Sequence, residues 1–144
     1  KTHRCLIPAD GFYAWKKVGK KTNVPWRIVL KSREVFSLAG MWEEYDDHEG
    51  NSFHTFSMIT VPAEKWVSEI TDRVPVIFSN EEEKIWLDKN SLADQLISLL
   101  KVYPDDLMEG YNVSPGINSV DKDNPGLIIP TPPADQFGNL TLFD

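Results

Sequence analysis

The sequence has little of what proteins use for covalent, metal or membrane anchoring. It contains one cysteine among 144 residues, so no internal disulfide can form. It has no Cys-x-x-Cys pair or Cys/His cluster, which excludes the common zinc motifs. No apolar run approaches the roughly 20 residues of a membrane span. The opening residues also carry no apolar signal region. We therefore expect a cytoplasmic protein in a reducing compartment, without a metal, a cofactor or a membrane partner.

The familiar catalytic motifs are missing as well. The sequence has no P-loop, no dinucleotide-binding glycine motif, no nucleophile elbow and no zinc-protease helix motif. These absences exclude nucleotide hydrolysis and zinc proteolysis as interpretations. His3, His48 and His54 are scattered, and we interpret them as structural or solvated. Cys5 lies in a strand-like run, which is typical of a small buried thiol rather than a nucleophile.

Charge is distributed unevenly along the chain. The net charge of −7 argues at first against a nucleic-acid partner. However, residues 1–34 carry nine Lys or Arg and two acids, whereas residues 35–144 carry six and twenty. Such asymmetry indicates a polyanion-facing patch joined to an acidic remainder. The alternative is that the lysines at 16–21 only keep a turn between edge strands soluble.

The pattern of apolar residues predicts a mainly β domain with a few helices, an α+β class in which the strands are mostly antiparallel. Strands are expected at 4–7, 11–17, 26–31, 35–42, 53–61 and 73–78. An acidic solvent loop is expected at 43–52, and short extended pieces at 111–113 and 117–120.

Helix signals are fewer. About two helical turns are expected at 64–70. Ser79 with Glu82, or Asn80 with Glu83, forms a capping-box signature before a helix at 81–87. Ser91 is expected to open a second helix. Four of the ten prolines fall in 125–144, which we interpret as an extended C-terminal wrapper of one domain covering 1–144.

One segment combines aromatic and basic side chains. Three aromatics within residues 12–15 are followed at once by Lys16 and Lys17. Stacking surface beside positive charge is what single-stranded nucleic-acid sites use. Along a strand, Phe12 and Ala14 would share one face and Tyr13 and Trp15 the other, so the alternative is that at least one aromatic pair lies in the core.

A second segment, residues 60–75, combines rigid prolines with the pair Asp72-Arg73. This pair lies between an expected short helix and a strand. It is interpreted either as an internal ion pair or as a means of presenting Arg73 to a phosphate.

Five ordered motifs resemble one known family. They are Arg-Cys-Leu-Ile-Pro-Ala-Asp-Gly-Phe-Tyr-x-Trp at 4–15, Leu-Ala-Gly-Met-Trp-Glu at 38–43, Ile-Thr-Val-Pro-Ala at 59–63, Ile-x-Asp-Arg-Val-Pro-Val-Ile at 70–77, and Tyr-Asn-Val-Ser at 111–114 followed by Asn118. In this order they resemble the SRAP, or SOS response-associated peptidase, family. The resemblance implies a compact antiparallel, β-barrel-like fold that binds single-stranded DNA. It also implies that this chain is the C-terminal two-thirds of the family domain, with the first part upstream of Lys1.

The resemblance implies a chemistry whose groups we expect to be missing here. Complete family members cross-link abasic DNA as a thiazolidine through an N-terminal cysteine, and they cleave their own initiator methionine. That cysteine and a catalytic asparagine belong upstream of Lys1. The family glutamate corresponds to Ala14 and the family histidine to Thr71. A methyl group cannot transfer a proton, and a threonine hydroxyl is a poor substitute for imidazole near neutral pH.

The resemblance also implies a set of binding residues. Trp15 corresponds to a residue that stacks near the damaged nucleotide, Arg73 to one that contacts phosphate, and Thr60 to one that lines the site. Lys16 and Lys17 extend the positive edge on the charge argument alone. The expectation is a DNA-damage-response protein that binds single-stranded or abasic DNA without catalysis.

Two alternatives remain open at this point. One is an active SRAP autopeptidase and cross-linking enzyme whose N-terminal segment is missing from this chain. The other is a protein-interaction module that uses the acidic two-thirds. An incomplete β domain also exposes strand edges, so homo-oligomer formation is expected to compete with either role.

Overall fold

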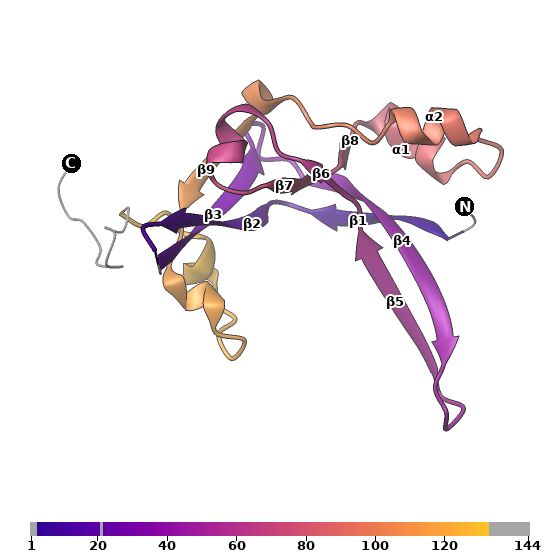
Figure 1. Cartoon of the computed structure of the whole chain (residues 1–144), viewed down its shortest axis with the longest axis horizontal. Coiled ribbons are helices and arrows are strands. Elements are labelled where there is room, and N and C mark those ends of the chain that lie inside the picture. The colour runs from indigo at the N-terminus through magenta and orange to yellow at the C-terminus, as the bar shows by residue number, and fades with distance from the viewer. Residues whose placement is uncertain (1–2, 21, 133–144) are drawn as a thin grey trace. The chain divides into compact units, whose positions relative to one another are not determined.

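The computed structural model describes residues 3–20 and 22–132. The chain divides into two compact units, each described here by itself. Unit 1 comprises residues 1–9, 34–63 and 73–103, and unit 2 comprises residues 10–33, 64–72 and 104–144. The strands pair antiparallel, in three separate sheets within the described residues (Figure 1), which confirms the mainly β class. No helix among the described residues is long and apolar enough to cross a membrane.

Unit 1 is built on the long strand β4. Its sheet contains β1 (Arg4–Ala9), β4 (Phe36–Asp46), β5 (Ser52–Met58) and β8 (Ile77–Phe78), with β1 and β5 on either side of β4. A two-stranded sheet pairs β6 (Thr60–Pro62) with β7 (Arg73–Pro75), and two helices follow, α1 (Asn80–Leu87) and α2 (Ala93–Ser98).

The core of unit 1 lies between its larger sheet and the two helices. Its buried members are Ala39, Val76, Phe78, Trp86, Leu96 and Leu99. The rings of Phe78 and Trp86 have centroids 5.3 Å apart, and the indole N–H of Trp86 donates to the carbonyl of Cys5 over 3.0 Å. Helix α1 is therefore held to strand β1 by both packing and a hydrogen bond.

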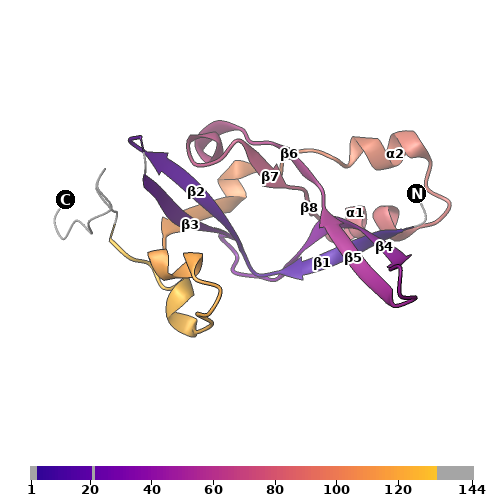
Figure 2. The ribbon, with the colours of Figure 1, turned by 60° about the horizontal axis from the view of Figure 1, so that its bottom comes forward.

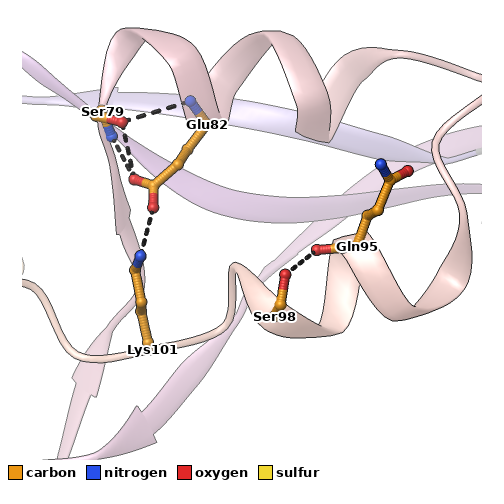
Figure 3. Close-up of polar contacts among 5 residues, drawn as sticks. All are labelled: Ser79, Glu82, Gln95, Ser98 and Lys101. Carbon is orange, nitrogen blue, oxygen red and sulfur yellow. Dashed lines mark hydrogen bonds and ion pairs between the residues drawn. The ribbon is translucent and has the colours of Figure 1, made fainter.

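The capping box predicted for α1 is confirmed (Figure 3). The Ser79 hydroxyl accepts from the backbone N–H of Glu82, and the Ser79 N–H donates to Glu82 Oε2 over 2.9 Å. Lys101 Nζ lies 2.9 Å from Glu82 Oε1. Burial by itself raises the pKa of Glu82, but the hydrogen bonds from Ser79 and Lys101 outweigh it and lower that pKa. The charged carboxylate thus stabilises both the helix start and the segment after α2.

The expected opening of the second helix is wrong by one residue. The N-cap of α2 is Leu92, whose backbone N–H donates to Gln95 Oε1 over 2.9 Å. The Ser91 hydroxyl instead donates to the carbonyl of Ile85 over 2.7 Å. Ser91 therefore ties the loop back to α1, a tertiary use that a capping pattern does not reveal.

Unit 2 is a three-stranded sheet with short 3-10 turns. The strands β2 (Phe12–Val18), β3 (Thr22–Leu30) and β9 (Met108–Asn112) pair in that order, and the turns are η1 (Lys65–Glu69), η2 (Asp105–Leu107), η3 (Pro115–Asn118) and η4 (Pro125–Ile128). One face of this sheet is buried through Ala14, Val24, Ile28, Leu30 and Met108. Trp66 of η1 packs on Gly110, where an added Cβ would come within 3.1 Å of the indole.

Several expected boundaries are corrected by the structure. The loop expected at 43–52 is wrong because β4 continues to Asp46, with Tyr45 stacked on Phe53 at 5.5 Å. The turn is confined to the residues around Gly50, whose φ of 83° suits glycine. The strand expected at 53–61 is divided into β5 and β6, and the one expected at 73–78 into β7 and β8.

The remaining corrections concern 3-10 turns and the tail. The helical turns expected at 64–70 are the 3-10 helix η1, Lys65–Glu69, whereas the first half of the extended piece expected at 117–120 belongs to the 3-10 helix η3. The expected wrapper begins with η4, where Leu127 is buried, and most of its remainder, residues 133–144, lies outside the described residues.

Candidate nucleic-acid interface

The hairpin of β2 and β3, residues 12–30, carries the strongest positive charge of unit 2. It contains five Lys or Arg and no acid, and we call it the basic hairpin. Gly19 in its turn has a φ of 65°, a conformation that glycine adopts without strain. The register places Tyr13 opposite Arg27 and Trp15 opposite Pro25. The local sequence therefore folds into a regular two-stranded ladder with aromatic and basic side chains on it.

Alternation divides the two lysines that follow Trp15. Lys17 shares the face of Trp15, whereas Lys16 lies on the opposite face, where its Nζ is 6.0 Å from the centroid of the Trp26 ring. Lys17 is exposed and Lys16 is half-buried. The two lysines therefore do not line one face together, and Lys17 is the one that accompanies the exposed indole.

One edge of the Trp15 indole is fixed by a hydrogen bond, while much of the residue is exposed to solvent. Its indole N–H donates to Asn118 Oδ1 over 2.8 Å, and 43% of the residue remains exposed. Asn118 ends η3, which begins with Ser114 capping the N–H of Gly116. Sequence reasoning included Asn118 in a motif without giving it a partner. Its position after the Tyr-Asn-Val-Ser segment in the ordered motifs is the only signal in the sequence, because Trp15 and Asn118 are 103 positions apart.

Arg27, on β3 of the basic hairpin, is a buried residue with a structural role. It is 8% exposed, its guanidinium lies 2.9 Å from Asp10 Oδ1, and it donates to the Tyr111 hydroxyl over 2.9 Å. Burial by itself lowers the pKa of Arg27, but the hydrogen bonds to Tyr111 and Asp10 outweigh it and raise that pKa. Burial, chiefly, raises the pKa of Tyr13, so its phenol stays neutral. Arg27 therefore braces the three strands with a permanent charge.

In unit 1, the structure brings Thr60 and Arg73 together. They lie on the paired strands β6 and β7, and Arg73 Nε donates to Thr60 Oγ1 over 2.8 Å. A second guanidinium nitrogen donates to the Thr60 carbonyl. Arg73 is nevertheless exposed. The threonine thus orients an arginine whose planar donor group suits a phosphate.

The positions expected to lack catalytic groups have unreactive surroundings. Ala14 is 5% exposed on the buried face of the basic hairpin, opposite Trp26. Thr71 follows η1, and its backbone N–H donates to the Val67 carbonyl over 3.1 Å. Burial raises the pKa of the Cys5 thiol, which keeps it protonated near neutral pH and agrees with its interpretation as a non-nucleophile.

Comparison with known proteins places these residues in a family. The profile of the family described as SOS response associated peptidase (SRAP) matches residues 1–120. The chain belongs to the SRAP family. It is 46% identical over 126 residues to "Abasic site processing protein YoqW" of Bacillus subtilis, covering 87% of this chain and 56% of that SRAP protein. It is 26% identical to rat "Abasic site processing protein HMCES", covering 90% of this chain and 44% of HMCES.

Solved structures agree with the SRAP assignment at the level of the fold. A crystal structure of a protein from Bacteroides thetaiotaomicron matches with a TM-score of 0.82 and 27% identity, covering 90% of this chain and 57% of that one. The chain spans about half the length of the curated SRAP relatives that it matches. Among the described residues, no group of three or more His, Cys, Asp or Glu is arranged to hold a metal ion.

Proposed function

We propose that this chain is the DNA-binding part of a DNA-damage-response protein that binds single-stranded or abasic DNA without a covalent step. The observation that carries the proposal is Trp15, an exposed indole clamped by Asn118 beside Lys17 on a hairpin with no acid. A fixed aromatic ring costs little entropy when a base stacks on it. Relatives named as abasic site processing proteins support the same class of substrate.

Arg73 is proposed to contact a phosphate. The bonds from its guanidinium to Thr60 hold the side chain in one orientation while it remains exposed. A pre-oriented guanidinium can form charge-assisted hydrogen bonds to phosphate oxygens. Thr60 is accordingly proposed as the residue that positions Arg73, and Lys16 and Lys17 as the cations that add affinity on either face of the basic hairpin.

The absence of a covalent step is proposed from two positions. Ala14 carries no proton-transfer group, and Thr71 has only a hydroxyl of ordinary acidity. Burial raises the pKa of the thiol of Cys5, the one cysteine of the sequence, so it is not a ready nucleophile near neutral pH. Binding is therefore proposed to be reversible.

Fluorescence anisotropy with a labelled single-stranded oligonucleotide tests the binding proposal. Base stacking on one aromatic side chain contributes about 1–3 kcal/mol, so Trp15→Ala should weaken binding by about 5-fold to 100-fold. Arg73→Glu should weaken binding more than Trp15→Ala does, and it should reduce the salt dependence of binding. The matched control is Phe56→Ala, which removes an exposed ring from β5 in unit 1 and should leave affinity unchanged. Equal affinities of the unaltered chain and Trp15→Ala would refute the proposal.

A denaturing gel with abasic single-stranded DNA tests the lack of a covalent step. The unaltered chain should run free of DNA, while native gels show a complex. A covalent band from this chain would show that other residues replace Ala14 and Thr71. A form extended upstream to a Met-Cys start that cross-links would instead favour the active enzyme, with this chain as its binding part.

A further inference from the structure

A second hairpin, in unit 1, has the opposite chemistry and is not used by the proposed DNA site. Strands β4 and β5 with their turn, residues 36–58, contain five acids and no Lys or Arg; we call them the acidic hairpin. Strand β1 pairs with Phe36–Met41, and the Trp42 N–H also donates to the His3 carbonyl over 2.8 Å, while β4 and β5 pair with each other as far as Asp46 and Ser52 (Figures 1 and 2). Among the described residues, β5 pairs with β4 alone and is therefore an edge strand.

Hydrogen bonds at the two ends of the β4–β5 pair determine which residue pairs along it are hydrogen-bonded and which are not. Asp47 N–H donates to the Asn51 carbonyl over 2.9 Å, and Ile59 N–H donates to the Ala39 carbonyl over 2.9 Å. Both bonds belong to the one uninterrupted register of β4 and β5. In an antiparallel ladder, bonded and non-bonded pairs alternate. Residues 53, 55 and 57 therefore bond to β4, whereas residues 52, 54, 56 and 58 direct their backbone N–H and C=O groups away from it.

No described strand pairs with that outer edge. Every residue of β5 is exposed, and β5 ends its sheet. Natural edge strands are usually blunted by lysine, proline, a bulge or a covering element. Strand β5, with the sequence Ser-Phe-His-Thr-Phe-Ser-Met, has neither lysine nor proline, and its register has no bulge. The edge is thus left available for another strand to pair with it.

Aromatic side chains of β5 lie on both faces of the sheet next to its outer edge. Phe56 is 68% exposed and lies opposite Trp42, while Phe53 is 43% exposed and stacks on Tyr45. His54, between them in sequence, pairs with Glu44 at 3.2 Å. A strand added to β5 would place its alternate side chains over Phe53 on one face and over Phe56 on the other.

The negative charge of the acidic hairpin favours one kind of segment at the outer edge of β5. The carboxylates on β4 lie two strand spacings, about 10 Å, from the position of an added strand, which is near the Debye length at moderate salt. Lysine or arginine side chains on that strand would be attracted both by these carboxylates and by the faces of Phe53 and Phe56. A phosphodiester backbone would be repelled by the same charges.

We propose that the outer edge of β5 binds an extended, basic segment of a partner protein as an added antiparallel or parallel β-strand. Main-chain hydrogen bonds at residues 52, 54, 56 and 58 provide the pairing, and the aromatic and acidic side chains provide the preference for a basic segment. The proposal does not depend on DNA binding by unit 2.

Isothermal titration with synthetic peptides tests this proposal. The probe is a nine-residue peptide of alternating Lys and Val. Its control has the same sequence but is N-methylated at two consecutive central residues, which removes one amide donor from each edge of the strand. The alternating peptide should bind at least about 10-fold more tightly than the control. No binding of the probe, or equal binding of both peptides, overturns the proposal, because charge alone does not distinguish them.

Two variants locate the binding edge. His54→Pro removes an outward N–H without removing a bond to β4, so it should reduce probe affinity to that of the N-methylated control. Phe56→Ser leaves the backbone unchanged and should weaken binding several-fold. Circular dichroism checks that both variants fold, and the peptide comparison on the unaltered chain stands if His54→Pro does not. Sedimentation that shows a dimer abolished by His54→Pro would overturn the proposal in favour of a second copy.

Discussion

The basic hairpin of unit 2 and the acidic hairpin of unit 1 have the same topology and opposite environments. One carries five basic residues and no acid, and the other five acids and no base. Strand β3 of the basic hairpin is paired on both sides, by β2 and β9, whereas β5 of the acidic hairpin is paired only by β4. Strand β4 is likewise paired on both sides, by β1 and β5, so each hairpin has one inner strand and one edge strand. The two hairpins differ in charge and in exposure, because every residue of β5 is exposed whereas β2 includes the buried Ala14.

Hydrogen exchange should give the largest difference between the two hairpins. Amides of the middle strand β3, such as Ile28, should exchange only through large openings, which cost up to the global 5–15 kcal/mol. The outward amides of His54 and Phe56 should exchange with almost no protection. Mass spectrometry of peptides or NMR measures both sets. Strong protection of His54 and Phe56 in the isolated chain would mean that the edge of β5 is already paired.

Truncating one side chain in each hairpin should lower the free energy of unfolding by very different amounts. Ile28 is fully buried, so Ile28→Ala should lower the free energy of unfolding by about 2–5 kcal/mol. Phe56→Ala, at a residue that is 68% exposed, should change it by no more than about 0.5 kcal/mol. Urea unfolding followed by circular dichroism measures both. Similar losses from the two variants would contradict the view that Ile28 of the inner strand β3 is packed in a core and Phe56 of the edge strand β5 is not.

Unit 1, which carries the acidic hairpin, should also be the more acid-sensitive unit, because of the carboxylate of Glu82 at the start of α1. Ser79→Ala removes the cap of α1 and should cost about 1 kcal/mol. Because the folded-state pKa of Glu82 lies below its ordinary value, its contribution is fully present above about pH 4.3 and is lost as pH falls through the folded pKa. Urea unfolding at pH 7 and pH 3 should show that Glu82→Gln destabilises the chain less at the lower pH. An equal cost at both pH values would contradict this account.

The smallest effect is expected where the basic hairpin meets η3. Asn118→Leu removes the hydrogen bond to the indole of Trp15, which is worth about 0.5–1.5 kcal/mol, and should weaken binding to single-stranded DNA by about 2-fold to 10-fold. In a Trp15→Phe background the same change should have no further effect, since a phenyl ring has no N–H to donate. Anisotropy measurements on the four proteins give the coupling directly. Additive losses would show that Asn118 acts independently of Trp15.

The sequence predicted local structure best where short-range rules apply. The α1 helix, its Ser79 and Glu82 capping box and the alternating strands around Trp15 were predicted from spacing of two to four residues, and the structure confirms them. The region 43–52 was wrongly predicted as a loop because acidic composition was taken as a sign of a turn. Cross-strand pairs such as Tyr45 with Phe53 are not visible in either strand's own pattern.

Family membership could be recognised from the sequence alone, because it depends on residue identity at ordered positions. The assignment of Ala14 and Thr71 to the family's catalytic positions stays a prediction. Only the tertiary structure decided the contact of Trp15 with Asn118, the contact of Lys16 with the Trp26 ring, and the outward amides of β5. The reason is physical: strand register and contacts across a hundred residues are set by the packing of whole elements, and a single sequence carries no direct record of that packing.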